Sequence, residues 1–143
     1  MLKPKKMVSL FLTMVIALSI GCIGVSATEI TPQSVTPTTT VQLNTNASTQ
    51  IIPWSVYSGM GYWKIHLVNN TSSMMTVRIF KDTPQGTPLF TGYVNANSEL
   101  PFYATDGSPL ASGAYYVTVS TNGSVNLNGT LYYKFATTYN ELF

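Results

Sequence analysis

From about residue 51 onward, apolar and polar residues alternate along the chain with a period of two. This alternation is typical of β-strands that bury one face and expose the other. The side chains predicted to face a core are Trp63, Ile65, Leu67, Met75, Val77, Ile79, Tyr115, Val117, Val119, Val125, Leu127, Leu131, Tyr133 and Phe135. No stretch after residue 27 shows a helical period, so the pattern predicts an all-β chain.

Turn residues separate these segments at short intervals. Pro84 and Gly86 end one predicted strand, and residues 121–124 contain the Asn-Gly pair that is typical of a tight hairpin. Gly129 marks an expected bulge in the last predicted strand. Roughly seven or eight short strands, spaced about ten residues apart, predict an antiparallel two-sheet β-sandwich over residues 51–143.

Residues 110–119 carry the pattern Leu-x-x-Gly-x-Tyr-x-Val-x-Val. This pattern resembles the penultimate strand of small bacterial jelly-roll modules, notably the pre-peptidase C-terminal family, and the similarity extends over about residues 61–135. The resemblance implies a jelly-roll sandwich in which Gly113 makes a corner and Tyr115, Val117 and Val119 enter the core. Modules of this family resemble carbohydrate-binding jelly rolls and usually accompany larger secreted enzymes.

The first 27 residues have the layout of a secretory signal peptide. Three lysines precede an uncharged apolar run over residues 7–23, and residues 25–27 (Val-Ser-Ala) supply the small residues that a signal peptidase requires. The run is short for a bilayer span, and no basic cluster follows it. The sequence therefore predicts a secreted, extracellular protein that begins at Thr28 and has no membrane span in its mature form.

Cys22 leaves a second interpretation of this leader open. Residues 18–22 resemble a bacterial lipobox, in which the cysteine after glycine is lipidated and becomes the mature N-terminus, although Ser19 stands where leucine is usual. The protein would then be lipid-anchored at the cell surface. Because Cys22 is the chain's single cysteine, the mature domain is expected to form no internal disulfide.

Residues 28–50 form a polar lead-in, rich in Thr, Ser, Asn and Gln and poor in large apolar side chains. A segment of this composition buries too little apolar surface to offset the entropy lost on ordering. We therefore expect residues 28–50 to be a flexible tether, with residues 41–43 as the one part able to pair as an edge strand.

Beyond the leader, four basic side chains stand against five acidic ones, which gives a net charge of −1. The basic residues are Lys64, Arg78, Lys81 and Lys134, and the acidic residues are Glu29, Asp82, Glu99, Asp106 and Glu141. Binding to nucleic acids or to anionic membranes relies on clustered positive charge, which this sequence does not show. We therefore expect no nucleic-acid partner.

Residues that catalyse reactions or bind metals are scarce. His66 is the single histidine, and a Ser–His–Asp triad built on it would need Asp82 or Asp106, whose positions next to turns already explain them. No serine lies in a Gly-x-Ser-x-Gly motif. With one histidine and no cysteine beyond the leader, a zinc site is not expected. We predict a chain without catalytic residues, metal or cofactor.

Aromatic side chains are a better indication of a binding site. Trp54, Tyr57 and Tyr62 fall close to the turn of residues 58–61. Tyr116 and Tyr132 each belong to an adjacent tyrosine pair, of which strand alternation sends one ring outward. Such a ring can stack on the apolar face of a sugar while polar neighbours bond the hydroxyls. In the alternative interpretation, these aromatics are core residues or ordinary strand formers on a half-exposed face.

Three functional hypotheses follow, in decreasing order of support. The first is an exported, non-catalytic module that binds a cell-surface or environmental glycan or protein. The second is a self-associating surface or matrix subunit, in which the polar lead-in adds a strand to a neighbour's sheet edge. The third is a secreted hydrolase that uses His66 or an Asp/Glu pair.

Overall fold

The computed structural model describes residues 34–143. The predicted signal peptide, Cys22 and residues 28–33 lie outside this range. The described chain contains the strands β1 (Thr39–Gln42), β2 (Thr49–Val56), β3 (Tyr62–Asn69), β4 (Met75–Lys81), β5 (Phe90–Val94), β6 (Ser98–Tyr103), β7 (Gly113–Ser120) and β8 (Gly129–Ala136), followed by the 3-10 helix η1 (Tyr139–Leu142). Between residues 34 and 143, no helix is long and apolar enough to cross a membrane.

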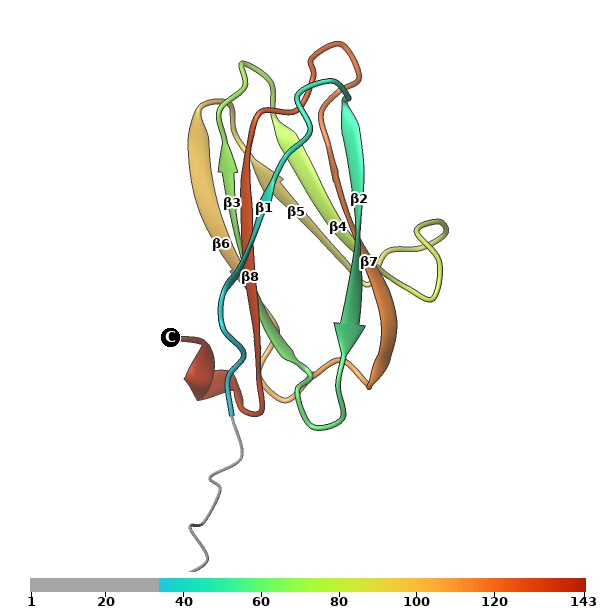
Figure 1. Ribbon diagram of the computed structural model, residues 1–143, viewed down its shortest axis with the longest axis vertical. Coiled ribbons are helices and arrows are strands. Elements are labelled where there is room, and N and C mark those ends of the chain that lie inside the picture. Colours follow the sequence, from blue (N-terminus) through green and yellow to red (C-terminus); the bar gives the residue numbers. More distant parts are fainter. Residues whose placement is uncertain (1–33) are drawn as a thin grey trace, which may run out of the picture. The chain divides into compact units, whose positions relative to one another are not determined.

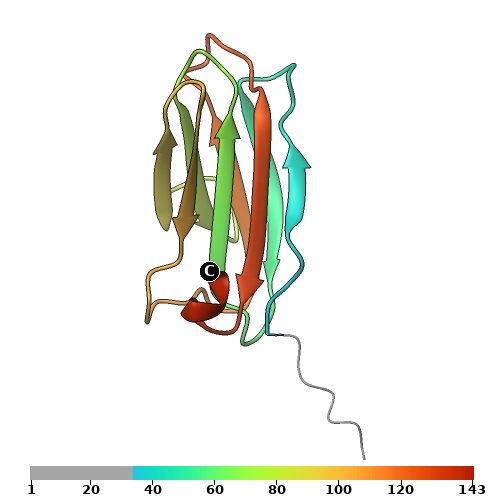
Figure 2. The ribbon, with the colours of Figure 1, turned by 90° about the vertical axis from the view of Figure 1, so that its left-hand side faces the viewer.

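The strands form two antiparallel four-stranded sheets that pack face to face (Figures 1 and 2). Sheet A has the order β1-β8-β3-β6, and sheet B has the order β2-β7-β4-β5. The first strand pairs with the last, the second with the seventh, the third with the sixth and the fourth with the fifth. This is the connectivity of a jelly roll, so the predicted all-β, jelly-roll-like sandwich is confirmed.

The core lies between the sheets and is built from alternate residues of their strands. On β3 and β7, buried side chains alternate with half-exposed ones, as expected of strands with one face on a core. All the residues predicted to face inward are buried except Val125 and Tyr133, which are half-buried. Trp54 is also a core residue, because its ring centroid lies 5.0 Å from those of Tyr133 and Phe135.

The polar lead-in, within the described residues, belongs to the sandwich rather than to a tether. β1 pairs with β8, and β2 begins at Thr49 and pairs with β7. Leu43 is buried, and its backbone N–H donates to the Gly129 carbonyl at 3.0 Å. Composition underestimates the order of this segment because pairing along a sheet edge uses main-chain groups, which every residue type supplies. The sandwich therefore begins before residue 51.

Asn69 holds one end of β3 in place. Its amide nitrogen donates to the carbonyls of Ser73 and Asn95, at 2.8 and 2.9 Å, and its amide oxygen accepts from the Thr71 backbone N–H at 2.9 Å. The side chain is buried, so these bonds satisfy polar groups that would otherwise be costly. Asn69 thereby ties β3 of sheet A to the β5–β6 connection, and it fixes the strand that carries the candidate site.

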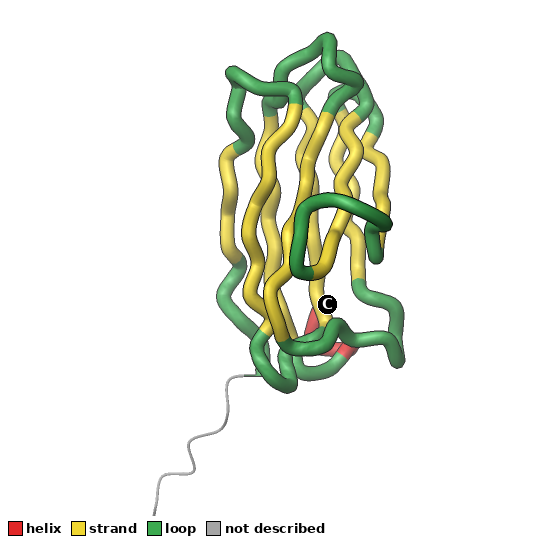
Figure 3. Tube along the Cα trace, turned by 90° about the vertical axis from the view of Figure 1, so that its right-hand side faces the viewer, coloured by secondary structure: helices red, strands yellow, loops and turns green. Residues whose placement is uncertain are grey.

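The outer faces of the two sheets are covered differently. The loop that joins β4 to β5 stands out from sheet B (Figures 1 and 3). On the other side, η1 lies against the lower end of sheet A, with Leu142 fully buried (Figure 2). The C-terminal segment therefore encloses one end of the sheet A face.

Candidate functional site

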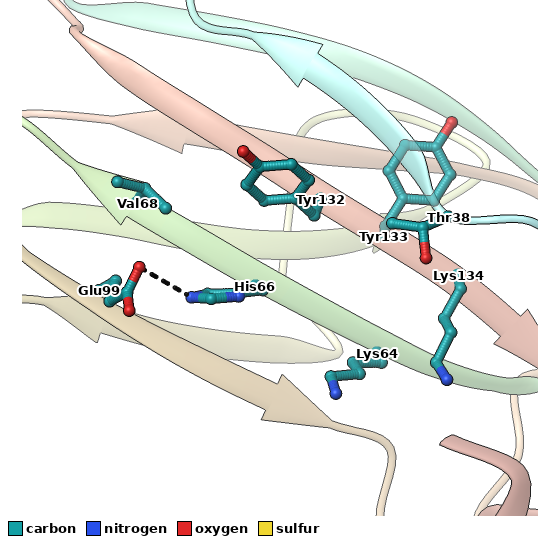
Figure 4. Close-up of a pocket in the computed structure, with 8 residues that line it drawn as sticks. All are labelled: Thr38, Lys64, His66, Val68, Glu99, Tyr132, Tyr133 and Lys134. Atoms are coloured by element: carbon teal, nitrogen blue, oxygen red, sulfur yellow. Dashed lines mark ion pairs between the residues drawn. The ribbon is translucent and has the colours of Figure 1, made fainter. Parts of the chain in front are cut away.

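The outer face of sheet A contains a depression of about 440 Å³, which we call the sheet A groove (Figure 4). Its volume falls in the range of small-molecule binding sites. It is lined by Thr38, Lys64, His66, Val68, Glu99, Tyr132, Tyr133 and Lys134. The lining comes from three strands of the sheet, β3, β6 and β8, and from the residue that precedes β1.

Strand register brings these residues together. His66 on β3 stands opposite Tyr132 on β8, and Lys64 stands opposite Lys134. On the other side of β3, Val68 stands opposite Glu99 of β6. Directly opposed side chains on one face of an antiparallel pair lie close enough to interact. The groove is therefore a set of cross-strand rows, with the His66–Tyr132 row between the lysine row and the Val68–Glu99 row.

His66 links an aromatic ring to a carboxylate. Its ring centroid lies 5.9 Å from that of Tyr132, at an interplanar angle of 45°. Its Nε2 lies 3.3 Å from Oε2 of Glu99, with the two side chains 35% and 63% exposed. This distance allows an ion pair when the imidazole is protonated, but Nε2 is buried and forms no hydrogen bond to the described chain. Nε2 is therefore enclosed beside Glu99, while the His66 side chain as a whole lines the groove.

The two lysines are held by uncharged groups. The Nζ of Lys64 lies 5.1 Å from the centroid of the Tyr103 ring. The Nζ of Lys134 donates to the backbone carbonyl of Glu141 at 3.3 Å. Among residues 34–143, the one ion pair is that of His66 with Glu99, so neither lysine is paired with a carboxylate there.

The Glu141 carboxylate accepts hydrogen bonds from the residues just before η1. Its Oε2 accepts from Thr137 Oγ1 at 2.7 Å and from the Thr138 backbone N–H at 2.9 Å. The Thr137 hydrogen bond, followed by one from Ser34, lowers the pKa of Glu141 from 4.5 to about 2. The ionised carboxylate therefore stabilises the start of η1, and it forms no ion pair with Lys134.

An aromatic cluster adjoins the lysine end of the groove. Tyr103 and Phe143 are stacked, with ring centroids 4.7 Å apart and an interplanar angle of 24°. Tyr139 makes edge contacts with Phe143 and with Tyr62, at centroid distances of 5.2 and 6.3 Å. This C-terminal aromatic cluster of Tyr62, Tyr103, Tyr139 and Phe143 extends the apolar surface beyond Lys64.

The five predicted ligand residues do not form one site. Tyr132 lines the groove, and Tyr62 belongs to the C-terminal aromatic cluster. Tyr116 lies on sheet B, and Tyr57 is 68% exposed in the turn between β2 and β3. Trp54 is 3% exposed, so its rings fill the core and offer no face to a ligand. Large aromatics provide core volume as readily as binding surface, which is why sequence alone placed Trp54 among the candidates.

The groove also contains residues that sequence reasoning did not select. Lys64, Lys134 and Glu99 line it, and Thr38 closes it on the β1 side. Alternation shows that Lys64 and Lys134 leave their strands on the outer side. It does not show that they are cross-strand neighbours, because the pairing of β3 with β8 joins segments far apart in the sequence.

The surroundings of His66 and the placement of the acidic side chains bear on catalysis and metal binding. The carboxylate in contact with His66 is Glu99, rather than Asp82 or Asp106, the acids considered for a triad. Among residues 34–143, no group of three or more His, Cys, Asp or Glu side chains is placed to hold a metal ion.

No known protein family matches this sequence, and no curated protein does. Solved structures with a similar arrangement include a chain of Bacillus endospore appendages, described as disulfide-linked pili, with 12% identity, a TM-score of 0.47 and coverage of 72% of this chain and 88% of that one. The pre-peptidase C-terminal domain of a Bacillus anthracis collagenase has 22% identity, a TM-score of 0.43 and coverage of 70% and 86%.

A third similar structure is the CBM36-1 domain of a multidomain xylanase from the hindgut metagenome of Trinervitermes trinervoides. It has 16% identity, a TM-score of 0.44 and coverage of 70% of this chain and 97% of that one. A pre-peptidase C-terminal domain is thus among the similar structures. Fold similarity at this distance does not specify function, which we argue from the groove itself.

Proposed function

We propose that this chain is a non-catalytic binding module of the cell exterior and that it holds a glycan in the sheet A groove, against the ring of Tyr132. The observation that carries the proposal is a half-buried aromatic ring within a hollow of about 440 Å³. Rings in such positions bury a large apolar area at little entropic cost, since their side chains have few rotatable bonds.

The neighbours of Tyr132 suit the hydroxyl groups of a sugar. His66 contributes its partly exposed imidazole, Glu99 contributes acceptor oxygens, and Thr38 contributes a hydroxyl. A few polar groups converging on an apolar surface are typical of small-molecule and carbohydrate sites, because they orient a ligand that the apolar surface holds. The groove is also open on one side, which a polymer requires.

A matched pair of variants tests the site. Tyr132→Ala should weaken binding in a titration against a panel of soluble polysaccharides by about tenfold, which corresponds to about 1.4 kcal/mol for an interfacial aromatic. Tyr116→Ala is the control, because Tyr116 has the same outward orientation on sheet B and should leave affinity unchanged. The size distribution of the polymer should stay constant during incubation. Equal binding by both variants and the unmodified protein would rule out this site.

The extracellular location is a separate part of the proposal and rests on the leader. The intact mass of the mature protein tests it: a chain that begins at Thr28 supports secretion, and a lipid-modified chain that begins at Cys22 supports anchoring at the cell surface. A chain that keeps its leader, recovered from the cytosol, would contradict both versions.

Self-association through the polar lead-in finds less support in the structure. Residues 39–42 pair with β8, and residues 49–56 pair with β7 of the same chain. These residues can add to a neighbour's sheet only after they leave their own, which would also expose Leu43 and Ile52. Size-exclusion chromatography at high concentration, with a monomer as the expected result, tests this alternative.

A further inference from the structure

We infer that the glycan bound in the sheet A groove is acidic and that Lys64 and Lys134 together recognise its carboxylate; this inference rests on the proposed function. The two lysines are direct cross-strand partners on one face of sheet A (Figure 4). Like charges in that arrangement destabilise a sheet. A chain in which charged residues make up 8% of the sequence nevertheless places two of the four basic residues beyond its leader side by side.

Within residues 34–143, neither lysine of this pair forms an ion pair with a carboxylate. Lys64 lies over the Tyr103 ring, and Lys134 donates to a backbone carbonyl. The nearby Glu141 carboxylate accepts hydrogen bonds from Thr137 and Thr138 instead. The pair therefore attracts an anion locally, although residues 34–143 carry four basic and four acidic side chains and have no overall charge to attract one.

The lysine row lies two residues along each strand from the His66–Tyr132 row. Lys64 precedes His66 by two residues on β3, and Lys134 follows Tyr132 by two residues on β8. Residues two apart on a strand are separated by about 7 Å, which the flexible stem of lysine spans easily. A sugar ring stacked on Tyr132 thus places a ring carboxylate, or that of the adjoining sugar, within reach of both amino groups.

The chemistry of the donors favours a carboxylate on a sugar over a bare anion. A simple anion would require only the two amino groups, whereas the groove also offers the Tyr132 ring and the polar side chains of His66 and Thr38. A uronic acid uses all of these elements: its ring stacks, its hydroxyls hydrogen-bond, and its carboxylate meets the lysines. We therefore assign polymers that contain uronic acids as the ligand class.

The test compares polymers that differ in charge alone. Polygalacturonate, alginate and hyaluronan are each titrated beside their carboxyl-reduced forms, which keep the sugar backbone but lack the charge. The full mature chain should bind at least one acidic polymer about tenfold more tightly than its reduced form, and added salt should erode this preference.

Variants assign the preference to the lysine pair. Lys64→Gln/Lys134→Gln should bind the acidic and reduced polymers alike, and Lys64→Arg/Lys134→Arg should keep the preference. Lys81→Gln, at an exposed lysine that ends β4 in the other sheet, is the matched control and should behave as the unmodified protein. The unfolding midpoint of each variant shows that the fold is intact.

The outcomes separate this inference from the proposed function. Equal binding of charged and reduced polymers by the unmodified protein, or a preference that survives in the glutamine double variant, would overturn the acidic-ligand assignment and leave glycan binding in place. Binding restricted to sulfated or phosphate-containing polymers would also overturn it. Failure of every polymer to bind would end both proposals.

Discussion

Sheet A and sheet B each carry a tyrosine near the middle of the outer face, on a strand with neighbours on both sides. Tyr132 of β8 stands between Thr40 and His66. Tyr116 of β7 stands between Pro53 and Phe80. The first tyrosine has polar neighbours and lines a groove, whereas the second has apolar neighbours and lies beside Phe80, which is 7% exposed although it lies outside the main core.

The comparison shows that the cross-strand partners of an outward ring decide whether it lies beside a groove or on a packed surface. Apolar neighbours pack together on a sheet surface because contact removes them from water. The polar and charged side chains around Tyr132 instead line a hollow beside the ring. Two tyrosines with the same strand position and orientation therefore have different surroundings because different strands flank them.

The largest expected effect concerns the hydrophobic core, which lies beneath both outer faces. Trp54→Ala should destabilise the whole sandwich by about 3–5 kcal/mol, because it removes a buried ring that contacts Tyr133 and Phe135 in the core beneath both faces. Urea denaturation measures this loss, with Tyr57→Ala as the exposed aromatic control within about 0.5 kcal/mol of the unmodified protein. A Trp54→Ala protein of unchanged stability would contradict the core assignment.

A smaller effect should be confined to sheet A. Leu142→Ala should cost about 2 kcal/mol, since Leu142 is fully buried where η1 packs on this sheet. Hydrogen exchange should become faster in residues 137–143 and at the lysine end of the groove, while sheet B keeps its protection. An equal increase of hydrogen exchange in both sheets would contradict the packing of the C-terminal segment on sheet A alone.

The smallest effect is a pH dependence on the sheet A side. Glu141 has a pKa of about 2 in the folded chain instead of 4.5, so its contribution to stability is fully present above about pH 4.5 and is lost as the pH falls toward 2. Residues 137–143 should loosen in this window, as monitored by NMR chemical shifts. Glu141→Gln should remove the transition, and a transition that persists in that variant would point to another group.

The strand positions could be predicted from the sequence because alternation is a local signal. The burial of Trp63, Ile65 and Leu67 on β3 and of Val117 and Val119 on β7 follows the apolar positions of the sequence directly. Alternation says nothing of Phe80, which is buried although it lies outside the main core. The sequence predicts at most an edge strand over residues 41–43, and β1 does lie at the edge of sheet A. It does not predict the start of β1 or of β2, because main-chain pairing orders a polar segment there.

The groove could be predicted only in part, because it depends on register between distant strands. The outward positions of Tyr132 and His66 follow from the sequence. Their contact does not, since it requires β8 to lie beside β3 in one particular alignment. The lysine pair has the same origin, because Lys64 and Lys134 become neighbours only when that alignment is known.

The position of β8 has a consequence for the order in which the fold can form. β8 lies between β1 and β3, although it is the last strand along the chain (Figure 1). A chain delivered from its N-terminus leaves β1 without any neighbour, and β3 with only β6, until β8 arrives. Sheet A therefore closes only after β8 has been made, because β8 is the strand that joins β1 to β3.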